Sequence, residues 1–352
     1  MLKPHLSSAT LSALGAALLF GGSTPFAKQL VGNISPLLLA GFLYLGSGMG
    51  LGFVRLIKDR GWNGSGLLKG EWAWLMAAIA FGGMIAPTLL MVGLSHTSAA
   101  TSSLLLNLEA VLTAVLAWIF FKESTDRRII LGMLLIVAGG VLLSWPQKIA
   151  PQNWLGTVSI AGACLCWAID NNLTRKISSS DAFFIAGSKG LVAGVVNISL
   201  AFFIGLTFPA WTNISYTMLL GFFGYGISLV LFVLALRGLG TARTGAYFST
   251  APFIGAGIAI LFFHESPSGL FWAAAALMGT GVWIHLTESH SHIHTHESLY
   301  HNHSHCHDEH HQHTHDFPWD GKEPHTHPHQ HEELTHSHHH YPDIHHRHRH
   351  KE

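Results

Sequence analysis

The amino-acid sequence predicts an all-α membrane protein with ten transmembrane helices in two inverted five-helix repeats, followed by a disordered tail. Three observations predict this fold: ten long apolar stretches, two segments that match each other at a fixed offset, and a histidine-rich C-terminal region. The chain has 352 residues, of which 49% are hydrophobic and 11% are charged. Soluble domains carry about 25% charged residues, so this composition indicates a lipid environment.

Stretches of about 17–25 apolar residues are long enough to cross a bilayer as helices. The sequence contains ten, at residues 9–30, 36–57, 72–94, 101–121, 129–145, 154–174, 183–206, 214–236, 244–263 and 268–286. The first stretch could be a signal peptide, but its apolar run continues to about Leu30 without a clear small-x-small cleavage site. We therefore expect it to be a transmembrane helix.

Two segments of the chain match each other without a gap. Trp72–Ser124 aligns with Ile214–Ser266 at an offset of 142 residues, and 13 of the 53 pairs are identical, including Glu123 with Glu265. Internal duplication in a membrane chain is typical of carriers built from two related halves. We expect residues 1–145 to form the first repeat, residues 154–286 the second, and residues 287–352 the tail.

Positive charges alternate along the ten predicted helices. The loops after the even-numbered helices carry eleven Lys or Arg residues, whereas the other loops carry only Lys28 and Lys148. The positive-inside rule therefore places both termini in the cytoplasm, in a multi-pass protein of the cell membrane. Because each half has an odd number of helices, the second half enters the membrane from the opposite side. This predicts an inverted repeat, which is typical of alternating-access carriers.

Several motifs carry a resemblance to a known family. They are Gly93–Ala100, Leu108–Val111 and Phe120–Glu123, the counterparts Ala251–Phe253 and Phe262–Glu265, and Gly22–Lys28. In these motifs the chain resembles the EamA-type transporters of the drug/metabolite transporter superfamily. The resemblance implies ten helices in two inverted halves and transport of small organic metabolites, often outward. The chain departs from the family pattern at Ala110, where the family often has proline.

Polar residues inside the predicted spans are the candidates for a transport site. An ionisable side chain in the hydrocarbon is costly unless it faces a partner or water. Glu109 is expected well inside the fourth helix and Lys189 about two turns into the seventh. Glu109 could take up a proton or a cationic substrate, with Lys189 binding a carboxylate or keeping Glu109 charged. Alternatively, the two residues form a pair that only locks helices together.

Four further residues complete the candidate substrate or proton site. Asn107 lies next to Glu109, and Trp167 lies beside Asp170 in the sixth helix. Asp170 and Lys28 are expected near helix ends, where they could instead extend to the membrane surface.

Enzymatic activity is not expected. The sequence has no nucleophile elbow, P-loop or H-E-x-x-H motif, so we predict no catalytic residues and no required cofactor. Positive and negative residues are equal in number, at 19 each, which indicates no nucleic-acid partner. The expected partners are a small-molecule substrate, the lipid bilayer and transition-metal ions, and the expected state is a monomer or homodimer.

The C-terminal tail is rich in histidine. Of 28 histidines in the chain, 24 lie between His290 and His350, often in H-x-H steps. The candidate metal ligands are His290, His292, His294, His296, His301, His303, His305, His307, His325, His327, His329 and His331. Imidazole suits Zn²⁺, Ni²⁺, Co²⁺ and Cu²⁺, so divalent metal binding is expected, although the tail could simply aid solubility. An alternative function is a divalent-metal transporter or a metal-regulated carrier.

Overall fold

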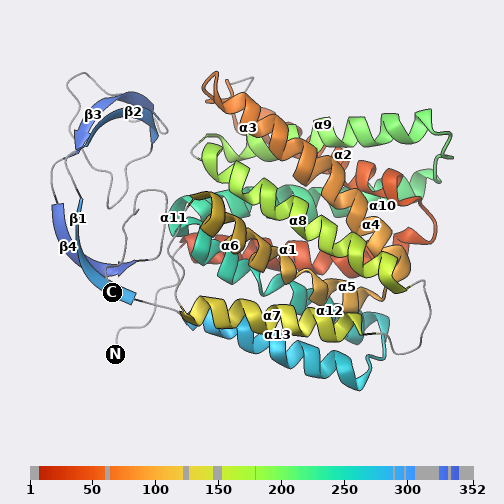
Figure 1. The fold of residues 1–352 in the computed structure, drawn as a ribbon. Coiled ribbons are helices and arrows are strands. Elements are labelled where there is room, and N and C mark those ends of the chain that lie inside the picture. The colour runs from red at the N-terminus through yellow and green to blue at the C-terminus, as the bar shows by residue number, and fades with distance from the viewer. Residues whose placement is uncertain are drawn as a thin grey trace.

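The computed structural model describes residues 8–59, 64–121, 127–145, 153–178, 180–287, 290–296, 299–305, 325–331 and 334–340. Between residues 8 and 287, the described part of the chain is mostly helical (Figure 1). The helices of the first half are α1 (Ser8–Val31), α2 (Pro36–Lys58), α3 (Glu71–Ala78), the π-helix η1 (Ile79–Ile85), α4 (Ala86–His96), α5 (Ala99–Leu105), α6 (Leu108–Phe121) and α7 (Arg127–Ser144). Those of the second half are α8 (Asn153–Ile177), α9 (Ala182–Phe203), α10 (Trp211–Gly221), the π-helix η2 (Phe222–Ile227), α11 (Ser228–Phe248), α12 (Ala251–Phe263) and α13 (Gly269–Thr287).

The helices identify an integral, multi-pass membrane protein. Within the described residues, eight helical segments are long and apolar enough to cross a membrane, and residues 130–144 form a shorter apolar helix. The 25-residue helix α8 covers the predicted sixth span, but it carries Asp170, Asn171 and Asn172 and is not among the eight. Ten spans therefore remain a prediction.

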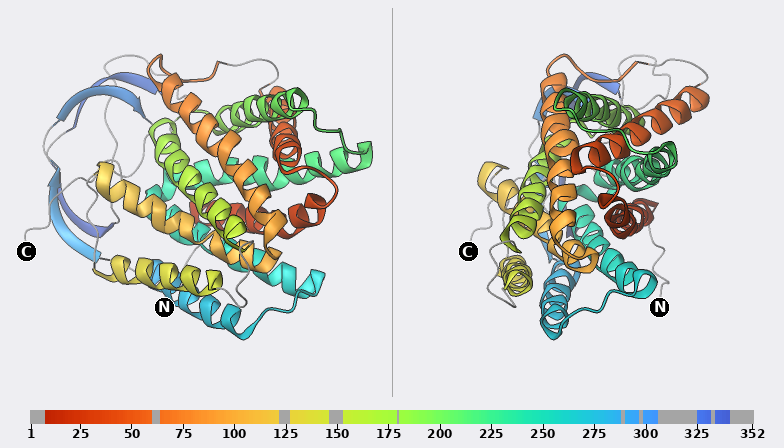
Figure 2. Two further views of the ribbon diagram at one scale, coloured as in Figure 1. Left: turned by 45° about the vertical axis from the view of Figure 1, so that its right-hand side comes forward. Right: turned by 90° about the vertical axis from the view of Figure 1, so that its right-hand side faces the viewer.

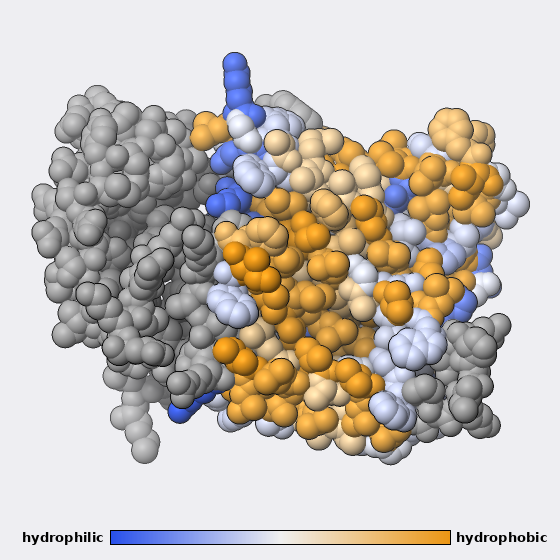
Figure 3. All heavy atoms as spheres, viewed as in Figure 1, coloured by the Kyte–Doolittle hydropathy of each residue, from blue (hydrophilic) through white to orange (hydrophobic). Residues whose placement is uncertain are grey.

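The exterior of the helical bundle is apolar, as contact with lipid requires. Figure 3 shows hydrophobic side chains covering much of one face of the bundle. Phe120, Phe202 and Phe203 expose 72%, 67% and 83% of their surfaces. Apolar patches of this extent are rare on soluble monomers, so this surface fits a bilayer.

Two irregularities occur at matching positions of the duplicated segment. The π-helix η1 ends at Ile85 and η2 ends at Ile227, 142 residues later. A helix break at Leu106–Asn107 separates α5 from α6, and a break at Ser249–Thr250, one residue beyond the exact offset, separates α11 from α12. Pro252 lies in the first turn of α12, where its missing N–H costs no hydrogen bond.

The structure differs from three expected helix boundaries. Arg237 and Arg243 were expected in a loop, but α11 is continuous from Ser228 to Phe248. Glu109 lies near the middle of the apolar segment Ala99–Phe120, as expected, but in the first turn of α6 and directly after a break. Asp170 lies inside α8, which continues to Ile177. Periodicity alone could not locate these boundaries, because the surrounding residues are apolar throughout.

The packing interleaves the two halves. Helix α2 packs against α9, α7 against α13, α1 against α11, and α4 against α8. Figure 2 shows α7 and α13 side by side in both views. Glycines allow close approach of α2 and α9: a Cβ on Gly48 would lie 2.2 Å from the Leu191 nitrogen, and one on Gly190 would lie 2.4 Å from the Gly48 nitrogen. Small residues at helix contacts are typical of membrane bundles.

Charged side chains lie at both ends of the bundle. At one end, Arg55 donates from Nε to Asp181 Oδ2 over 2.8 Å, and Arg237 donates from Nε to the Ser178 carbonyl over 2.6 Å. At the other end, Lys28 lies beside the turn between α4 and α5, which contains Thr97.

Four strands are described in the tail, where the sequence predicts disorder. They are β1 (His290–His296), β2 (Leu299–His305), β3 (His325–His331) and β4 (Leu334–His340). β1 pairs with β4 and β2 with β3, both antiparallel. The disorder prediction rested on the lack of an apolar face for a core, and an isolated two-stranded ribbon is only marginally stable in water, so disorder of the tail stays a prediction.

Candidate functional site

A buried ion pair lies between α8 and α9. The Lys189 ammonium donates to both carboxylate oxygens of Asp170, at 2.6 and 2.7 Å, and to Thr174 Oγ1 at 3.2 Å. Thr174 in turn donates to Asp170 Oδ1 over 2.9 Å. The side chains of Lys189 and Asp170 are only 1% and 7% exposed. A buried pair with additional hydrogen bonds is the arrangement that makes burial of two charges tolerable.

The backbone of Gly82 in η1 packs directly against the Asp170 carboxylate of this pair. A Cβ atom at Gly82 would fall 1.9 Å from Asp170 Oδ2, so only glycine fits beside the carboxylate. The Gly82 carbonyl accepts hydrogen bonds from the Tyr44 hydroxyl at 2.7 Å and from Trp167 Nε1 at 3.1 Å. A π-helical turn disturbs the regular α-helical ladder, and here two side chains satisfy a carbonyl of that turn.

Glu109 is the second buried acid, and its partner differs from the expected one. Asn171 donates from Nδ2 to Glu109 Oε1 over 2.8 Å and also reaches Thr113 Oγ1 at 3.5 Å. Lys189 pairs with Asp170 and not with Glu109, because α8 directs Asp170 towards α9 and Asn171 towards α6. Glu109 is 8% exposed and has no ion pair within the described part of the chain. A buried carboxylate with a neutral partner can exchange a proton or a cation.

Aromatic rings line the same region. The Phe20 ring centroid lies 5.5 Å from that of Trp167, 5.7 Å from that of Tyr225 and 5.4 Å from that of Phe248. The centroids of Tyr44 and Tyr225 are 5.5 Å apart. Because Trp167 and Asn171 are four residues apart on α8, this cluster and the Glu109–Asn171 pair occupy one face of that helix.

Several buried polar atoms lack a hydrogen-bond partner among the described residues. They include Asn107 Oδ1, Asn172 Oδ1, Thr24 Oγ1 and Ser103 Oγ. Asn107 uses its amide nitrogen on the Leu104 carbonyl, at 3.1 Å. Unpaired buried polar atoms are costly, so these groups are available to a bound solute or water.

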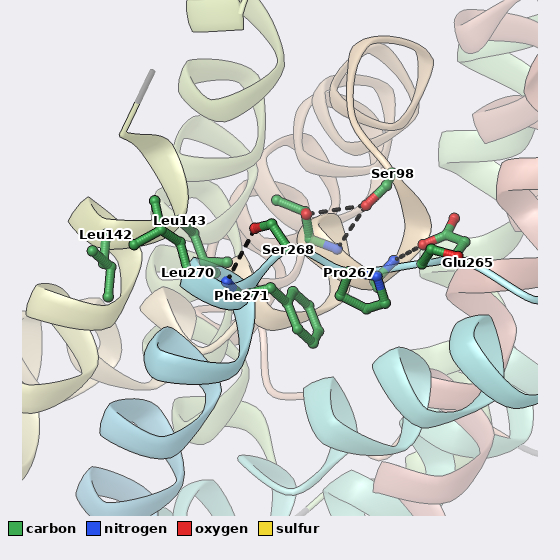
Figure 4. Close-up of a pocket in the computed structure, with 11 residues that line it drawn as sticks. Ser98, Leu142, Leu143, Glu265, Pro267, Ser268, Leu270 and Phe271 are labelled. Atoms are coloured by element: carbon green, nitrogen blue, oxygen red, sulfur yellow. Dashed lines mark hydrogen bonds between the residues drawn. The ribbon is translucent and has the colours of Figure 1, made fainter. Parts of the chain in front are cut away.

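A pocket of about 350 Å³ lies at the end of the bundle that contains Thr97 (Figure 4). Its polar wall includes Ser98, Thr101, Glu265 and Ser268, and its apolar wall includes Leu143. Both Glu265 carboxylate oxygens accept backbone hydrogen bonds, from the Ala99 and Ala100 nitrogens, each at 2.8 Å.

Lys28 lies at the same end of the bundle. Its amino group donates to the Thr97 carbonyl over 2.7 Å and also bonds the Leu94 carbonyl. Lys28 thus lies away from the Asp170–Lys189 pair, whereas Asp170, Trp167 and Lys189 lie together. Asn171, Tyr44 and Gly82 belong to the buried site but were not among the predicted residues; the Gly82 match in the repeat was the available signal.

The candidate metal ligands have no described side chains. Their backbones lie in β1, β2 and β3, except for His307, which is outside the described residues. Within the described part of the chain, no group of three or more His, Cys, Asp or Glu side chains is placed to hold a metal ion.

Comparison with known proteins agrees with the membrane architecture. The chain matches the EamA-like transporter family at residues 7–145 and 154–287. It is 26% identical over 290 residues to an uncharacterized transporter of Methanothermobacter thermautotrophicus, covering 78% of this chain and 84% of that protein. It is 25% identical over 291 residues to the uncharacterized transporter YvbV of Bacillus subtilis, covering 81% of this chain and 93% of the relative.

Two further similarities are more limited. A segment of 89 residues, 25% of this chain and 73% of the relative, is 39% identical to a probable 4-amino-4-deoxy-L-arabinose-phosphoundecaprenol flippase subunit, ArnE, of Pseudomonas paraeruginosa. A protein crystal structure aligns with a TM-score of 0.62 at 18% identity, over 79% of this chain and 96% of that one, which shows the fold alone. The relatives named as transporters and the two matched regions give one conclusion: the chain belongs to the EamA-like transporter family.

Proposed function

We propose that the protein is a secondary-active carrier that exports a small organic solute by alternating access, with Glu109 coupling transport to protons. The observation that carries this proposal is the pairing of the two buried acids. Asp170 is neutralised by Lys189, whereas Glu109 bonds the neutral Asn171 and has no ion pair among the described residues. The site therefore holds one acid whose charge is free to be balanced by a proton or by a cationic solute.

The inverted repeat is part of the proposal, with both termini in the cytoplasm and one repeat in each of residues 1–145 and 154–286. The matched π-helices and matched helix breaks support it. The packing supports it as well, because an inverted repeat relates the α1–α11 contact to the α4–α8 contact. Discontinuous helices at the interface of two repeats are typical of midplane binding sites in carriers.

Replacing Glu109 with glutamine tests the coupling. We expect solute-dependent proton flux in proteoliposomes to fall at least tenfold, because glutamine keeps the Asn171 contact but binds no proton. The flux is measured with trapped pyranine while amino acids, nucleosides, amines and sugars are added one at a time. Lipid-linked amino sugars belong in this panel because of the ArnE similarity.

The matched control is Glu71→Gln. Glu71 is a partly exposed carboxylate in the first turn of α3 that accepts a hydrogen bond from its neighbour Leu68. This change should leave the flux unaltered. If Glu109→Gln keeps wild-type flux over a range of pH, Glu109 does not couple transport.

A second proposal is that the cytoplasmic tail binds divalent transition metals, with no metal needed as a cofactor for transport. The register of the strands supports it: His292 pairs with His338 and His294 with His336, while His301 pairs with His329 and His303 with His327. Residues that face each other in an antiparallel ladder, and residues two apart, share one face of the ribbon. The register of each ribbon therefore sets histidine positions of one strand opposite histidine positions of the other.

Truncation after Thr287 tests the role of the tail. We expect Zn²⁺ or Ni²⁺ binding, measured by titration calorimetry, to be lost, while organic-solute transport continues. Unchanged metal binding after truncation would show that the tail is not the metal-binding region. Flux of Zn²⁺ into dye-loaded vesicles that disappears with the tail would instead favour a metal transporter.

A further inference from the structure

The turn between α4 and α5 is held from both sides by charged residues of other segments. The Lys28 amino group, at the end of α1, bonds the carbonyls of Leu94 and Thr97. The Glu265 carboxylate, just after α12, accepts the backbone N–H groups of Ala99 and Ala100. We call these two residues and their backbone contacts the end clamp. The clamp joins three segments that are far apart in the sequence.

The charges of the end clamp suit the helix ends that they contact. The last carbonyls of a helix carry partial negative charge and the first N–H groups carry partial positive charge. Lys28 lies against the end of α4, and Glu265 lies against the start of α5. Glu265 is oriented by His264, which ends α12 with a left-handed φ of 52°. The break at Thr97–Ser98 is thus stabilised by its surroundings as well as by the Ser98 cap, which accepts from the Thr101 nitrogen.

The segment of the second half that corresponds to the Thr97–Ser98 break is a continuous helix. At the offset of 142 residues, Thr97–Ser98 corresponds to Leu239–Gly240, and Ala99–Ala100 corresponds to Thr241–Ala242. There α11 continues without a break from Ser228 to Phe248. In a continuous helix these N–H groups donate to carbonyls four residues earlier and are not free to donate to a carboxylate. Gly238 and Gly240 are nevertheless weak helix formers, so a break there costs little.

We propose that the end clamp is the gate at one end of the carrier, and that the two halves show one gating element in its two conformations. With the clamp closed, the first half is broken at Thr97–Ser98 and α11 is continuous. When Glu265 releases Ala99 and Ala100, α4 and α5 join into one helix and α11 breaks at Gly238–Gly240. The inference rests on the proposed alternating-access function and on the inverted repeat. On the proposed orientation, the clamp closes the end that faces away from the cytoplasm.

Amide hydrogen exchange of Thr241 and Ala242 in lipid nanodiscs tests the gate. The Glu265→Ala variant loses the carboxylate, so the equilibrium shifts towards the state in which α11 is broken. We expect these two amides to exchange at least tenfold faster than in the wild type. A local structural role of Glu265 would change exchange only around Ala99 and Ala100, since α11 reaches the opposite end of the bundle at Arg237.

Two pairs of variants sharpen the measurement. Glu265→Gln keeps the shape of the side chain and serves if Glu265→Ala does not fold; it should give a smaller effect in the same direction. Adding Gly240→Ala should reverse the faster exchange, because alanine favours the continuous helix. Gly245 lies on the same helix, and nothing approaches within 4 Å of a Cβ added there. Adding Gly245→Ala is therefore the control and should not reverse the faster exchange.

Unchanged exchange at Thr241 and Ala242 in both Glu265 variants would overturn the gate, as would equal effects of the two alanine substitutions. The exchange experiment uses no solute and no pH gradient. If Glu109→Gln keeps wild-type proton flux, proton coupling by Glu109 is refuted. The exchange experiment remains a valid test of the gate in that case.

Discussion

Replacing Lys189 with methionine is expected to lower the free energy of unfolding by about 3–5 kcal/mol. The change would leave the Asp170 carboxylate buried, with Thr174 as its remaining hydrogen-bond donor. Removal of one member of a buried ion pair is costly because the other charge is left without its partner in a medium that solvates it poorly. The effect is measured as a shift of the unfolding transition of the detergent-solubilised protein.

Two controls separate the loss of the pair from a general effect of the substitution. Lys69→Met removes an exposed lysine and should shift the transition little, because exposed charges contribute about 0–1 kcal/mol. The double variant Lys189→Met, Asp170→Asn removes both charges and should recover part of the lost stability. If the double variant is no more stable than Lys189→Met, the uncompensated carboxylate is not the cause.

Replacing Gly82 with alanine is the second change with a large expected effect. The new methyl group would lie 1.9 Å from Asp170 Oδ2 and 2.2 Å from Asp170 Cγ, so the carboxylate must move away from its position opposite Lys189. Overpacking of this kind costs about 1–3 kcal/mol. We expect a lower unfolding transition and, because the buried site is displaced, at least a tenfold loss of solute-dependent flux in the pyranine assay.

Gly52→Ala is the matched control for Gly82. Both glycines lie within helical segments, but nothing approaches within 4 Å of a Cβ added at Gly52. Alanine there should be neutral or stabilising by up to about 1 kcal/mol, since it favours the helix over the unfolded chain. Equal stability of the Gly82→Ala and Gly52→Ala variants would show that Asp170 is not packed against the glycine backbone.

The sequence is informative about the membrane spans and the residue types of the site, and less so about their pairing. A buried lysine needs an acid, and both Glu109 and Asp170 were available to Lys189. The choice depends on the rotation of α8 about its axis, since neighbouring Asp170 and Asn171 contact different helices. Rotation is set by packing against other helices, which a single apolar sequence does not encode in its periodicity.

The helix break before Glu109 was equally difficult to predict. Leu104, Leu105, Leu106 and Leu108 surround Asn107 without proline or glycine, so nothing local indicates an interruption. The signal was in the other half, where Pro252 begins α12 after the matching break. By contrast, the repeated pair Glu123 and Glu265 marks corresponding positions of the two halves; Glu265 binds the start of α5, and Glu123 lies outside the described residues.

The absence of a side chain at Gly82 has a mechanical consequence. The Asp170 carboxylate lies against its backbone, and Trp167 and Tyr44 both hold its carbonyl. The segment from α3 to α4 is therefore tied to α8 and α2 at its middle, while its far end carries the Thr97 turn. In the proposed carrier, a tilt of this segment at the turn would therefore act on the Asp170–Lys189 pair through Gly82. Opening at the end of the bundle and rearrangement of the buried charges would then be linked through one helical segment.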